Sequence, residues 1–502
     1  MESVTVVTEP LLHRDFVQFE IVVPILERLR GKYDITLAAP KVAPAVKEEL
    51  ESKGIAVADG GVFFPPIRRS RDEIPSYVVS WMRDAIWGWN RRDIERVLKG
   101  RDGARINASM TVAIDSDVWL IQSRPLGQGV DAMRHSVSRP LSLAMTAALP
   151  FIRGLDHHHI LDTGRRAGIR YSTTQHVGNW FGTQGLPVAG VLPMYYRSTI
   201  SRSTRNPSRD YLLVYVGKET DTAAVRMLLD TGLPVTMFGS KSVGWVMSSL
   251  KLERYPHARL LGYVTDAELK ELYSNARFTA FPFTEEPFGL VPLESMACGT
   301  PILTYGEQGP GETVLDGRTG WLVHSREEFV RRAVELWNHG APPEWMVEQC
   351  LARARGYHID TVSAGWKMLF ESSLARREAG KPAGRPVAPP WTVPAMDVAV
   401  ASPTVTRAYA VGPEHLSSPP DAIPALIPME MPEPPDVYFE FWRSGGRRGL
   451  LEPEIGTLSG PPMVEFEDES GLDADESSPL RRGRDAARVP EESPQRPAPT
   501  AP

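Results

Sequence analysis

Strand-like and helix-like patterns alternate along the first two hundred residues. Residues 3–8 (SVTVVT) are β-branched and apolar, and apolar positions then recur at helical spacing over residues 16–29. A second buried-strand run, residues 33–39 (YDITLAA), precedes a helical pattern at residues 45–53. Strands that alternate with helices form parallel sheets covered on both faces, so the pattern predicts an α/β domain. Further strands are expected at residues 104–113, 117–122, 169–173 and 187–192.

The same alternation restarts after a polar stretch. Residues 196–209 (YRSTISRSTRNPSR) have no apolar period, which is typical of a linker. We therefore predict one domain over residues 1–195 and a second over residues 210–360. A final helix is expected over residues 361–379. Packing of this helix back toward the N-terminal domain is one expected arrangement. Strands of the second domain are expected at residues 211–216, 234–238, 258–261, 278–281 and 301–304.

The last quarter of the chain has a different composition. Residues 380–502 hold roughly half of the 45 prolines, and this favours a disordered, Pro-rich tail without a packed domain. An aromatic island at residues 436–451 (DVYFEFWRSGGRRGLL) has three interpretations: a binding motif, a strand that docks back, or, preferred here, a collapsed segment without function.

Charge and cysteine content exclude several classes of protein. A net charge of −6 and a pI near 6.1 argue against nucleic acid as a partner, because such binding requires a basic surface. Cys298 and Cys350 are the two cysteines, too few for a disulfide framework or a four-thiolate zinc site. The N-terminus lacks a signal-peptide pattern and no run reaches the ~18 apolar residues of a membrane span. These features predict a cytoplasmic protein.

The candidate chemistry lies in residues 281–323. A predicted strand ends near Pro282, Glu286 lies in the following loop, and Gly289 opens a helix that carries Glu294. Amides at a helix start, at the positive end of its dipole, suit a diphosphate, and Gly289 permits close approach. Carboxylates on both sides suit sugar hydroxyls, so the pattern favours a sugar nucleotide. The alternative is that Glu286 is a helix cap and Glu294 an exposed helical residue.

This run resembles the donor-binding signature of glycosyltransferase family four (group 1), the retaining GT-B enzymes. The family pattern is E-x-F-G-x4-E followed by G-x-P and G-x-x-E. The resemblance implies an α/β fold of two Rossmann-like domains facing a cleft, the first for the acceptor and the second for the donor. It also implies a hexosyltransferase that retains anomeric configuration and needs no metal or cofactor besides its nucleotide-sugar donor. The matching residues are Glu286, Phe288, Gly289, Glu294, Ala297, Gly299, Pro301 and Glu312.

The resemblance also implies roles for donor-site residues. Glu286 would contact the sugar, amides near Gly289 and Leu290 the β-phosphate, and Glu294 the ribose. The loop of Gly262, Tyr263 and Val264 would contact the base.

Gly217-Lys218 stands where the family usually has Gly-Arg, so Lys218 would neutralise the departing diphosphate. With Glu286, Lys218 is our catalytic candidate. The family's second cation has no match at residues 219–222. Lys241 is a substitute candidate, although a solvated loop lysine is preferred.

Acceptor-side candidates are less specific. Gln122 stands where the family often has histidine, and a glutamine cannot act as a base. Arg14 and His176 are further candidates for the cleft. The acceptor class stays open among carbohydrate, lipid-linked and protein acceptors.

Three other patterns are set aside in favour of plainer interpretations. Asp115-Ser116-Asp117 resembles a metal-binding D-x-D, but a turn before a strand is preferred. The triplet at residues 157–159 (HHH) makes a poor chelate, because adjacent helical residues point in different directions, and a solvated or helix-end cluster is preferred. Residues 77–98, rich in Trp and Arg, suit peripheral contact with the inner face of a membrane, but a helix packed on the core is preferred.

Two rival functions remain. A nucleotide-sugar 2-epimerase shares the implied architecture and would release a rearranged sugar nucleotide without an acceptor. A degenerate, non-enzymatic module would hold a sugar nucleotide while the tail recruits partners. Gln122 and the unmatched second cation are the only features that favour the second rival.

Overall fold

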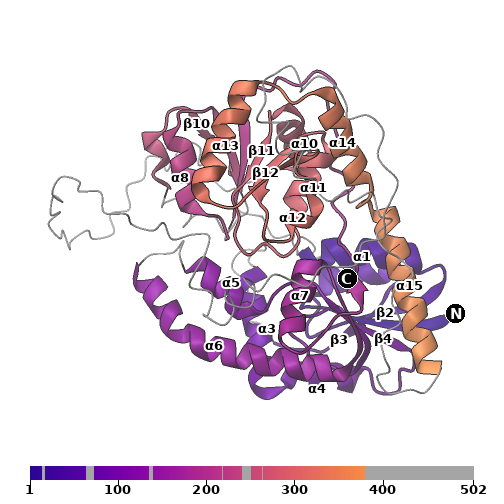
Figure 1. The fold of residues 1–502 in the computed structure, drawn as a ribbon. Coiled ribbons are helices and arrows are strands. Elements are labelled where there is room, and N and C mark those ends of the chain that lie inside the picture. The colour runs from indigo at the N-terminus through magenta and orange to yellow at the C-terminus, as the bar shows by residue number, and fades with distance from the viewer. Residues whose placement is uncertain are drawn as a thin grey trace, which may run out of the picture. The chain divides into compact units, whose positions relative to one another are not determined.

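A computed structural model describes residues 1–13, 17–63, 73–134, 139–217, 219–239, 250–262 and 264–378 (Figure 1). The predicted tail and its aromatic island lie outside the described residues. Four residues singled out from the sequence also lie outside them: Arg14, Lys218, Lys241 and Tyr263.

The N-terminal part is built on a parallel sheet. In the described residues its strand order is β3-β2-β1-β4-β5-β6-β7. From Val4 onward every residue of β1 is buried, as expected for a strand covered on both faces. The strands are β1 (Glu2–Val7), β2 (Tyr33–Ala39), β3 (Ala56–Asp59), β4 (Ala104–Asn107), β5 (Ser116–Ile121), β6 (Ala167–Ser172) and β7 (Gly190–Val191). The helices are α1 (Val17–Leu29), α2 (Pro44–Ser52), α3 (Glu73–Trp87), α4 (Trp89–Val97), α5 (Leu126–Met133), α6 (Arg139–Arg166) and α7 (Gln175–Thr183).

A second parallel sheet follows. Its described order is β10-β9-β8-β11-β12-β13. The α/β class with two parallel sheets is thereby confirmed. The strands are β8 (Leu212–Val216), β9 (Val235–Gly239), β10 (Ala258–Leu260), β11 (Thr279–Phe281), β12 (Ile302–Tyr305) and β13 (Gly320–Val323). The helices are α8 (Thr222–Asp230), the 3-10 turn η2 (Leu252–Arg254), α10 (Asp266–Asn275), α11 (Leu290–Ala297), α12 (Pro310–Thr313), α13 (Arg326–His339), α14 (Glu344–Arg355) and α15 (Ile359–Glu378).

Helix α15 belongs to the core of the first sheet, although it follows the second sheet in sequence. Trp366 and Phe370 are buried in the same cluster as Val4 and Ile25. The ring of Phe370 meets that of Tyr33 edge-on, with 5.1 Å between centroids. The chain therefore crosses back to its N-terminal sheet (Figure 1).

The strand expected at residues 104–113 ends earlier, because an asparagine closes a turn. The side-chain amide of Asn107 donates to the Val112 carbonyl at 2.8 Å, and its Oδ1 accepts from the Ser109 amide at 2.9 Å. Such local bonds compete with ladder hydrogen bonds. Strand β4 therefore stops at Asn107.

No helix in the described ranges, α6 included, combines the length and apolarity that a membrane span requires.

Candidate active site

The loops after β8 and β11 are tied together at the carboxyl ends of these neighbouring strands. Thr220 forms an antiparallel bridge with Phe283. The Asp221 amide donates to the Pro282 carbonyl at 2.8 Å, and the Thr284 amide donates to the Glu219 carbonyl at 3.1 Å. Segments more than sixty residues apart are thus brought together at the edge where ligands bind in α/β sheets. The neighbours of Lys218 lie beside the loop that carries Glu286.

Gly217 and Thr220 are held by close contacts. The Gly217 amide donates to Thr220 Oγ1 at 2.7 Å, and a Cβ on Gly217 would lie 2.9 Å from the ring of Phe283. Asp221 caps α8 by accepting from two amides of its first turn, and its Oδ2 is 2.7 Å from Arg326 Nε. Neither Asp221 nor Arg326 was predicted from the sequence, although an acid preceding residues 222–225 (TAAV) is an N-cap signal that marks Asp221.

Glu286 folds back over the start of α11. Its Oε1 accepts from the Gly289 amide at 3.0 Å. Its own amide donates to Gln308 Oε1 at 2.9 Å, and Gln308 Nε2 donates to the Phe283 carbonyl at 2.6 Å. The Gly289 amide, predicted to hold a phosphate, therefore has the Glu286 carboxylate as its partner here. Gln308, which the sequence analysis missed, fixes the loop from the end of the next strand.

The backbone of this loop has positive φ at two positions, of which only the non-glycine residue is strained. Gly289 has φ +95°, and a Cβ there would lie 2.8 Å from Pro310 Cγ. Glu285 has φ +64° although it is not glycine, which costs roughly 1 kcal/mol. An ion pair joins Glu285 to Arg124, whose side chain is 7% exposed. The strained residue, Glu285, therefore lies in the loop between β11 and α11.

Glu294 is buried at the end of a chain of polar contacts. Its Oε1 lies 2.7 Å from Arg197 Nε, and its Oε2 accepts from the Tyr273 hydroxyl at 3.3 Å. Arg197 Nη1 also contacts Asp266 Oδ1 at 2.5 Å, and the acids raise the pKa of Arg197 against the opposing effect of its burial. With 4% of its surface exposed, Glu294 is not the exposed helical residue of the alternative interpretation.

The partners of Glu294 come from two segments. Arg197 lies in the predicted linker, which the sequence analysis gave no role. Tyr273 lies in α10, and the first turn of that helix also holds Asp266, the second acidic partner of Arg197. The linker is thus part of the candidate site.

The segment predicted to contact the base lies further along the same sheet edge. Gly262 follows β10 with φ +67°, and its carbonyl accepts from the Gly239 amide at 3.0 Å. Val264 packs against the cluster that contains Phe238 and Tyr273. Since β10, β9, β8 and β11 are consecutive in the sheet, the segment lies two strands away from β8.

Glu312, the last acid of the resemblance, contacts the first sheet's elements. Its carboxylate accepts from the amides of Gln175 and His176 at 2.8 and 2.6 Å, so it caps the start of α7. Burial raises the pKa of Glu312 despite these bonds. Thr174 Oγ1 donates to the Pro287 carbonyl at 2.9 Å beside it. No pattern in the sequence points to this capping role.

Two acceptor-side candidates, Gln122 and His176, lie within the described residues. Gln122 has a hydrogen-bond partner, and the pKa of His176 is shifted. Gln122 is buried, and its Oε1 accepts from Gln18 Nε2 in α1. Burial, with the charge of Arg124, lowers the pKa of His176 to about 3. His176 is therefore uncharged at neutral pH and is a weak base.

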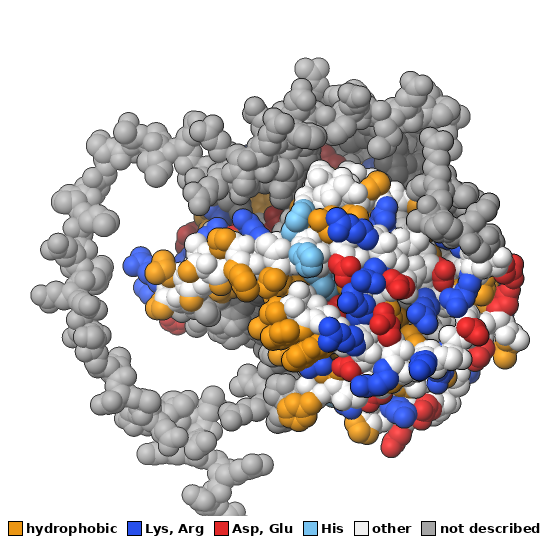
Figure 2. Space-filling model, turned by 90° about the horizontal axis from the view of Figure 1, so that it is seen from below, with side chains coloured by type: hydrophobic (Ala, Val, Ile, Leu, Met, Phe, Trp, Pro, Cys, Tyr) orange, Lys and Arg blue, Asp and Glu red, His pale blue; other side chains and the backbone are white. Residues whose placement is uncertain are grey.

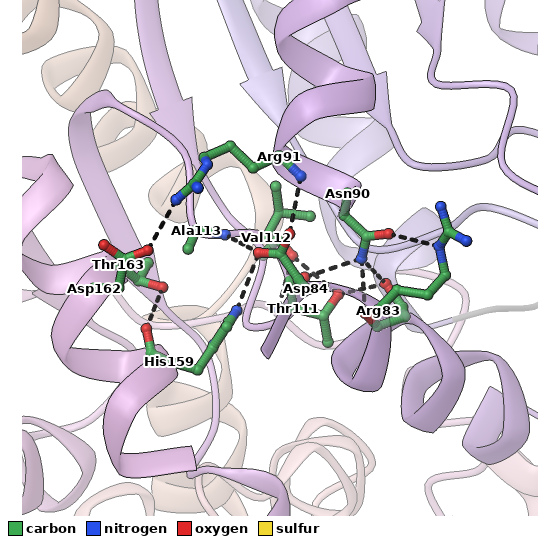
Figure 3. A network of polar contacts seen from close by, with 12 residues as sticks. Arg83, Asp84, Asn90, Arg91, Thr111, Val112, Ala113, His159, Asp162 and Thr163 are labelled. Atoms are coloured by element: carbon green, nitrogen blue, oxygen red, sulfur yellow. Dashed lines mark hydrogen bonds and ion pairs between the residues drawn. The ribbon is translucent and has the colours of Figure 1, made fainter. Parts of the chain in front are cut away.

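The motifs that were set aside have structural partners. Asp115 Oδ1 lies 3.0 Å from Arg166 Nη1, and Asp117 Oδ2 accepts from the Arg105 amide at 2.7 Å. His159 is buried with its Nε2 3.2 Å from Asp84 Oδ2, within a polar network that joins α3, α4 and α6 (Figure 3). His157 and His158 are exposed. Within the described ranges no group of three or more His, Cys, Asp or Glu is placed to hold a metal ion.

Comparisons with known proteins bear on this region. Residues 223–348 match the family model described as "Glycosyl transferases group 1". D-inositol 3-phosphate glycosyltransferase of Acidothermus cellulolyticus is 35% identical over 22% of this chain and 25% of that protein. Alpha-maltose-1-phosphate synthase of Mycolicibacterium smegmatis is 33% identical over 23% of this chain and 30% of that protein. These similarities support a group 1 glycosyltransferase assignment for the matched segment.

One solved structure extends the likeness over most of the chain. Sucrose-phosphate synthase from Thermosynechococcus elongatus superposes with a TM-score of 0.50 at 14% identity, covering 76% of this chain and 100% of that one. At that identity the likeness concerns the fold, which is GT-B. The chain spans about a quarter of the length of the first curated relatives it matches.

Proposed function

We propose that this protein is a retaining glycosyltransferase that moves a hexosyl group from a nucleotide-diphosphate sugar to an acceptor. One observation carries the proposal: the Glu286-to-Glu294 element opens α11 within the matched segment, at the strand edge beside the loop of Lys218. The acceptor is a carbohydrate, a lipid-linked sugar or a protein.

Donor binding in this proposal changes the partners of both glutamates. The Glu286 carboxylate turns from the Gly289 amide to the sugar hydroxyls and frees the first amides of α11 for the diphosphate. Glu294 turns an oxygen to the ribose while Arg197 keeps its bond to Asp266. Gly262 and Val264, with Tyr263, face the base.

The transfer step separates charge at this helix start. The bond from the anomeric carbon to the diphosphate oxygen breaks, and negative charge collects on the diphosphate. The α11 amides and Lys218 stabilise that charge. The acceptor hydroxyl adds to the same face of the sugar, and its proton goes to the departing diphosphate. Gln122 cannot take that proton, and the low pKa of His176 makes it a poor recipient.

The first test measures nucleotide binding by thermal unfolding of the full chain. Uridine, guanosine and adenosine diphosphates are each titrated, and the correct one at about 100 times its Kd should stabilise the fold by about 2.7 kcal/mol. Glu294→Gln, which keeps the side-chain shape, should lose most of this ligand-induced shift relative to its own melting temperature. Glu344→Gln is the matched control, because its side chain is 70% exposed and lies 3.4 Å from Arg202.

The second test follows sugar nucleotides of the selected base by NMR. Release of nucleoside diphosphate with a product of unchanged anomeric configuration supports the proposal. A rearranged sugar nucleotide without transfer identifies the epimerase, and binding without any turnover identifies the non-enzymatic module. If no nucleoside diphosphate shifts the melting temperature, the donor-site assignment is wrong.

A further inference from the structure

The outer face of α6 is mainly apolar from Leu143 to Phe151, where a surface helix is normally polar. Leu143 is 76% exposed and Phe151 is 67% exposed. Ala147 and Pro150 lie between them on the same exposed face, while Leu149 and Ile160 are buried on the opposite face. A helix that is apolar on both faces lacks a covering partner on one of them.

A second exposed apolar group lies at the junction of α3 and α4. Met82, Ile86, Trp87 and Trp89 are 41%, 38%, 45% and 40% exposed. The rings of Trp87 and Trp89 are stacked with centroids 4.7 Å apart. Exposed Trp side chains, apolar with one polar N–H, are typical of positions at a membrane–water interface.

Helix α3 packs on α6 along the face that carries Leu149, so the two groups belong to one pair of packed helices. Asp84 of α3 contacts His159 of α6, and Arg91 of α4 pairs with Asp162 of α6 at 3.0 Å (Figure 3). Figure 2 shows hydrophobic side chains gathered along α6 and beside it, with basic side chains at the outer end of the helix. We call the exposed residues of α3, α4 and α6 named above the apolar face.

The charges next to the apolar face are mainly positive. Between Arg139 and His158, Arg139 and Arg153 are exposed, whereas the one acid in that range, Asp156, is 5% exposed. Arg153 and Arg134 share Asp131 of α5 as their acidic partner, at 2.7 and 2.5 Å. The described surroundings of α6 therefore carry more basic than acidic charge, which favours an anionic partner.

We propose that the apolar face docks on the surface of an anionic lipid bilayer. Leu143, Phe151 and the Trp pair enter the headgroup–acyl boundary, and Arg139 and Arg153 contact lipid phosphates. Helix α5 packs on α6. It begins shortly after β5, and Gln122 and Arg124 lie in the short segment between them. Docking therefore brings the acceptor-side edge of the first sheet to the bilayer. Within the proposed function, this favours a lipid-linked acceptor.

Vesicle flotation of the full chain tests docking without any need for catalysis. The protein should float with vesicles of phosphatidylglycerol and phosphatidylcholine, float less with phosphatidylcholine alone, and dissociate as salt is raised. The double variant Leu143→Ser/Phe151→Ser should bind the vesicles at least about ten-fold more weakly than the wild type, since two exposed apolar anchors are lost. Arg139→Glu should weaken binding to the anionic vesicles only. Leu260→Ser is the matched control, because Leu260 is 42% exposed on β10 of the other sheet.

Each outcome decides the proposal. These side chains are exposed, so an unchanged melting temperature identifies a folded double variant. Absence of flotation by the wild-type protein, or equal flotation of the double variant, overturns membrane docking. If the double variant instead abolishes concentration-dependent self-association measured by ultracentrifugation, the apolar face joins two copies of the chain. Nucleotide stabilisation is measured without vesicles, so failure of docking and failure of the proposed function are distinguishable.

Discussion

At the scale of the residue, Asp156 shows how burial alone changes a titration. Desolvation raises the pKa of this carboxyl group to about 6, although backbone amides of α5 donate to it. The folded protein then binds the proton more tightly than the unfolded chain does. Stability from this group is present below pH ~4 and is lost as the pH rises through about 6, by up to about 3 kcal/mol.

Replacing this carboxyl group should remove that pH dependence. The variant Asp156→Asn should match the wild type near pH 4 and exceed it above pH ~6.5, because no charge then has to be buried. Urea unfolding at several pH values measures the difference in free energy. Asp115→Asn, at a side chain that is 67% exposed, is the control for replacing a surface carboxyl group. A difference for Asp156→Asn that does not grow with pH contradicts the assigned shift.

At the scale of the element, the start of α11 depends on a glycine for two separate reasons. Gly289 has a left-handed backbone, and Pro310 fills the place of its absent Cβ. Gly185 also has positive φ, +78°, but nothing lies within 4 Å of its Cβ position. Gly185→Ala therefore incurs the backbone penalty alone, about 1 kcal/mol.

Gly289→Ala should be the more costly substitution. Crowding against Pro310 adds to the backbone penalty, and we expect a loss of about 2 kcal/mol or more in urea unfolding. It should also reduce the nucleotide-induced thermal shift, which Gly185→Ala should leave unchanged. Equal costs for the two variants would show that Pro310 gives way and that α11 tolerates a side chain.

At the scale of the whole molecule, a Phe→Ala substitution should destabilise a different sheet depending on the core in which the phenylalanine is buried. Phe370 of α15 and Phe329 of α13 are both fully buried, the first in the core of the N-terminal sheet and the second in that of the C-terminal sheet. Each Phe→Ala change should cost about 3–5 kcal/mol. Hydrogen exchange should then quicken in β1 and β4 for Phe370→Ala, and in β8 and β12 for Phe329→Ala. Quickening in β8 for both variants would contradict the placement of α15.

Local patterns were sufficient for the class of the fold and for proposing the central element of the candidate site. Most residues of runs such as 33–39 are buried, and a strand covered on both faces needs apolar residues at consecutive positions, which the sequence shows directly. The residues from Glu286 to Glu294 are likewise adjacent in sequence, so a loop, a glycine and a helix start were recognisable together. The early end of β4 was missed because a side-chain bond at Asn107 competes with the strand.

The sequence by itself determined two parallel α/β sheets and the stretch on which a donor site would be built. Only the tertiary structure decided which distant groups complete that stretch: Arg197 against Glu294, Gln308 against Glu286, and Glu312 on the start of α7. It also decided that α15 returns to the first sheet and that α6 carries an apolar outer face. The reason is physical: residue spacing sets local conformation, whereas the packing of strands and helices decides which loops, charges and exposed side chains become neighbours.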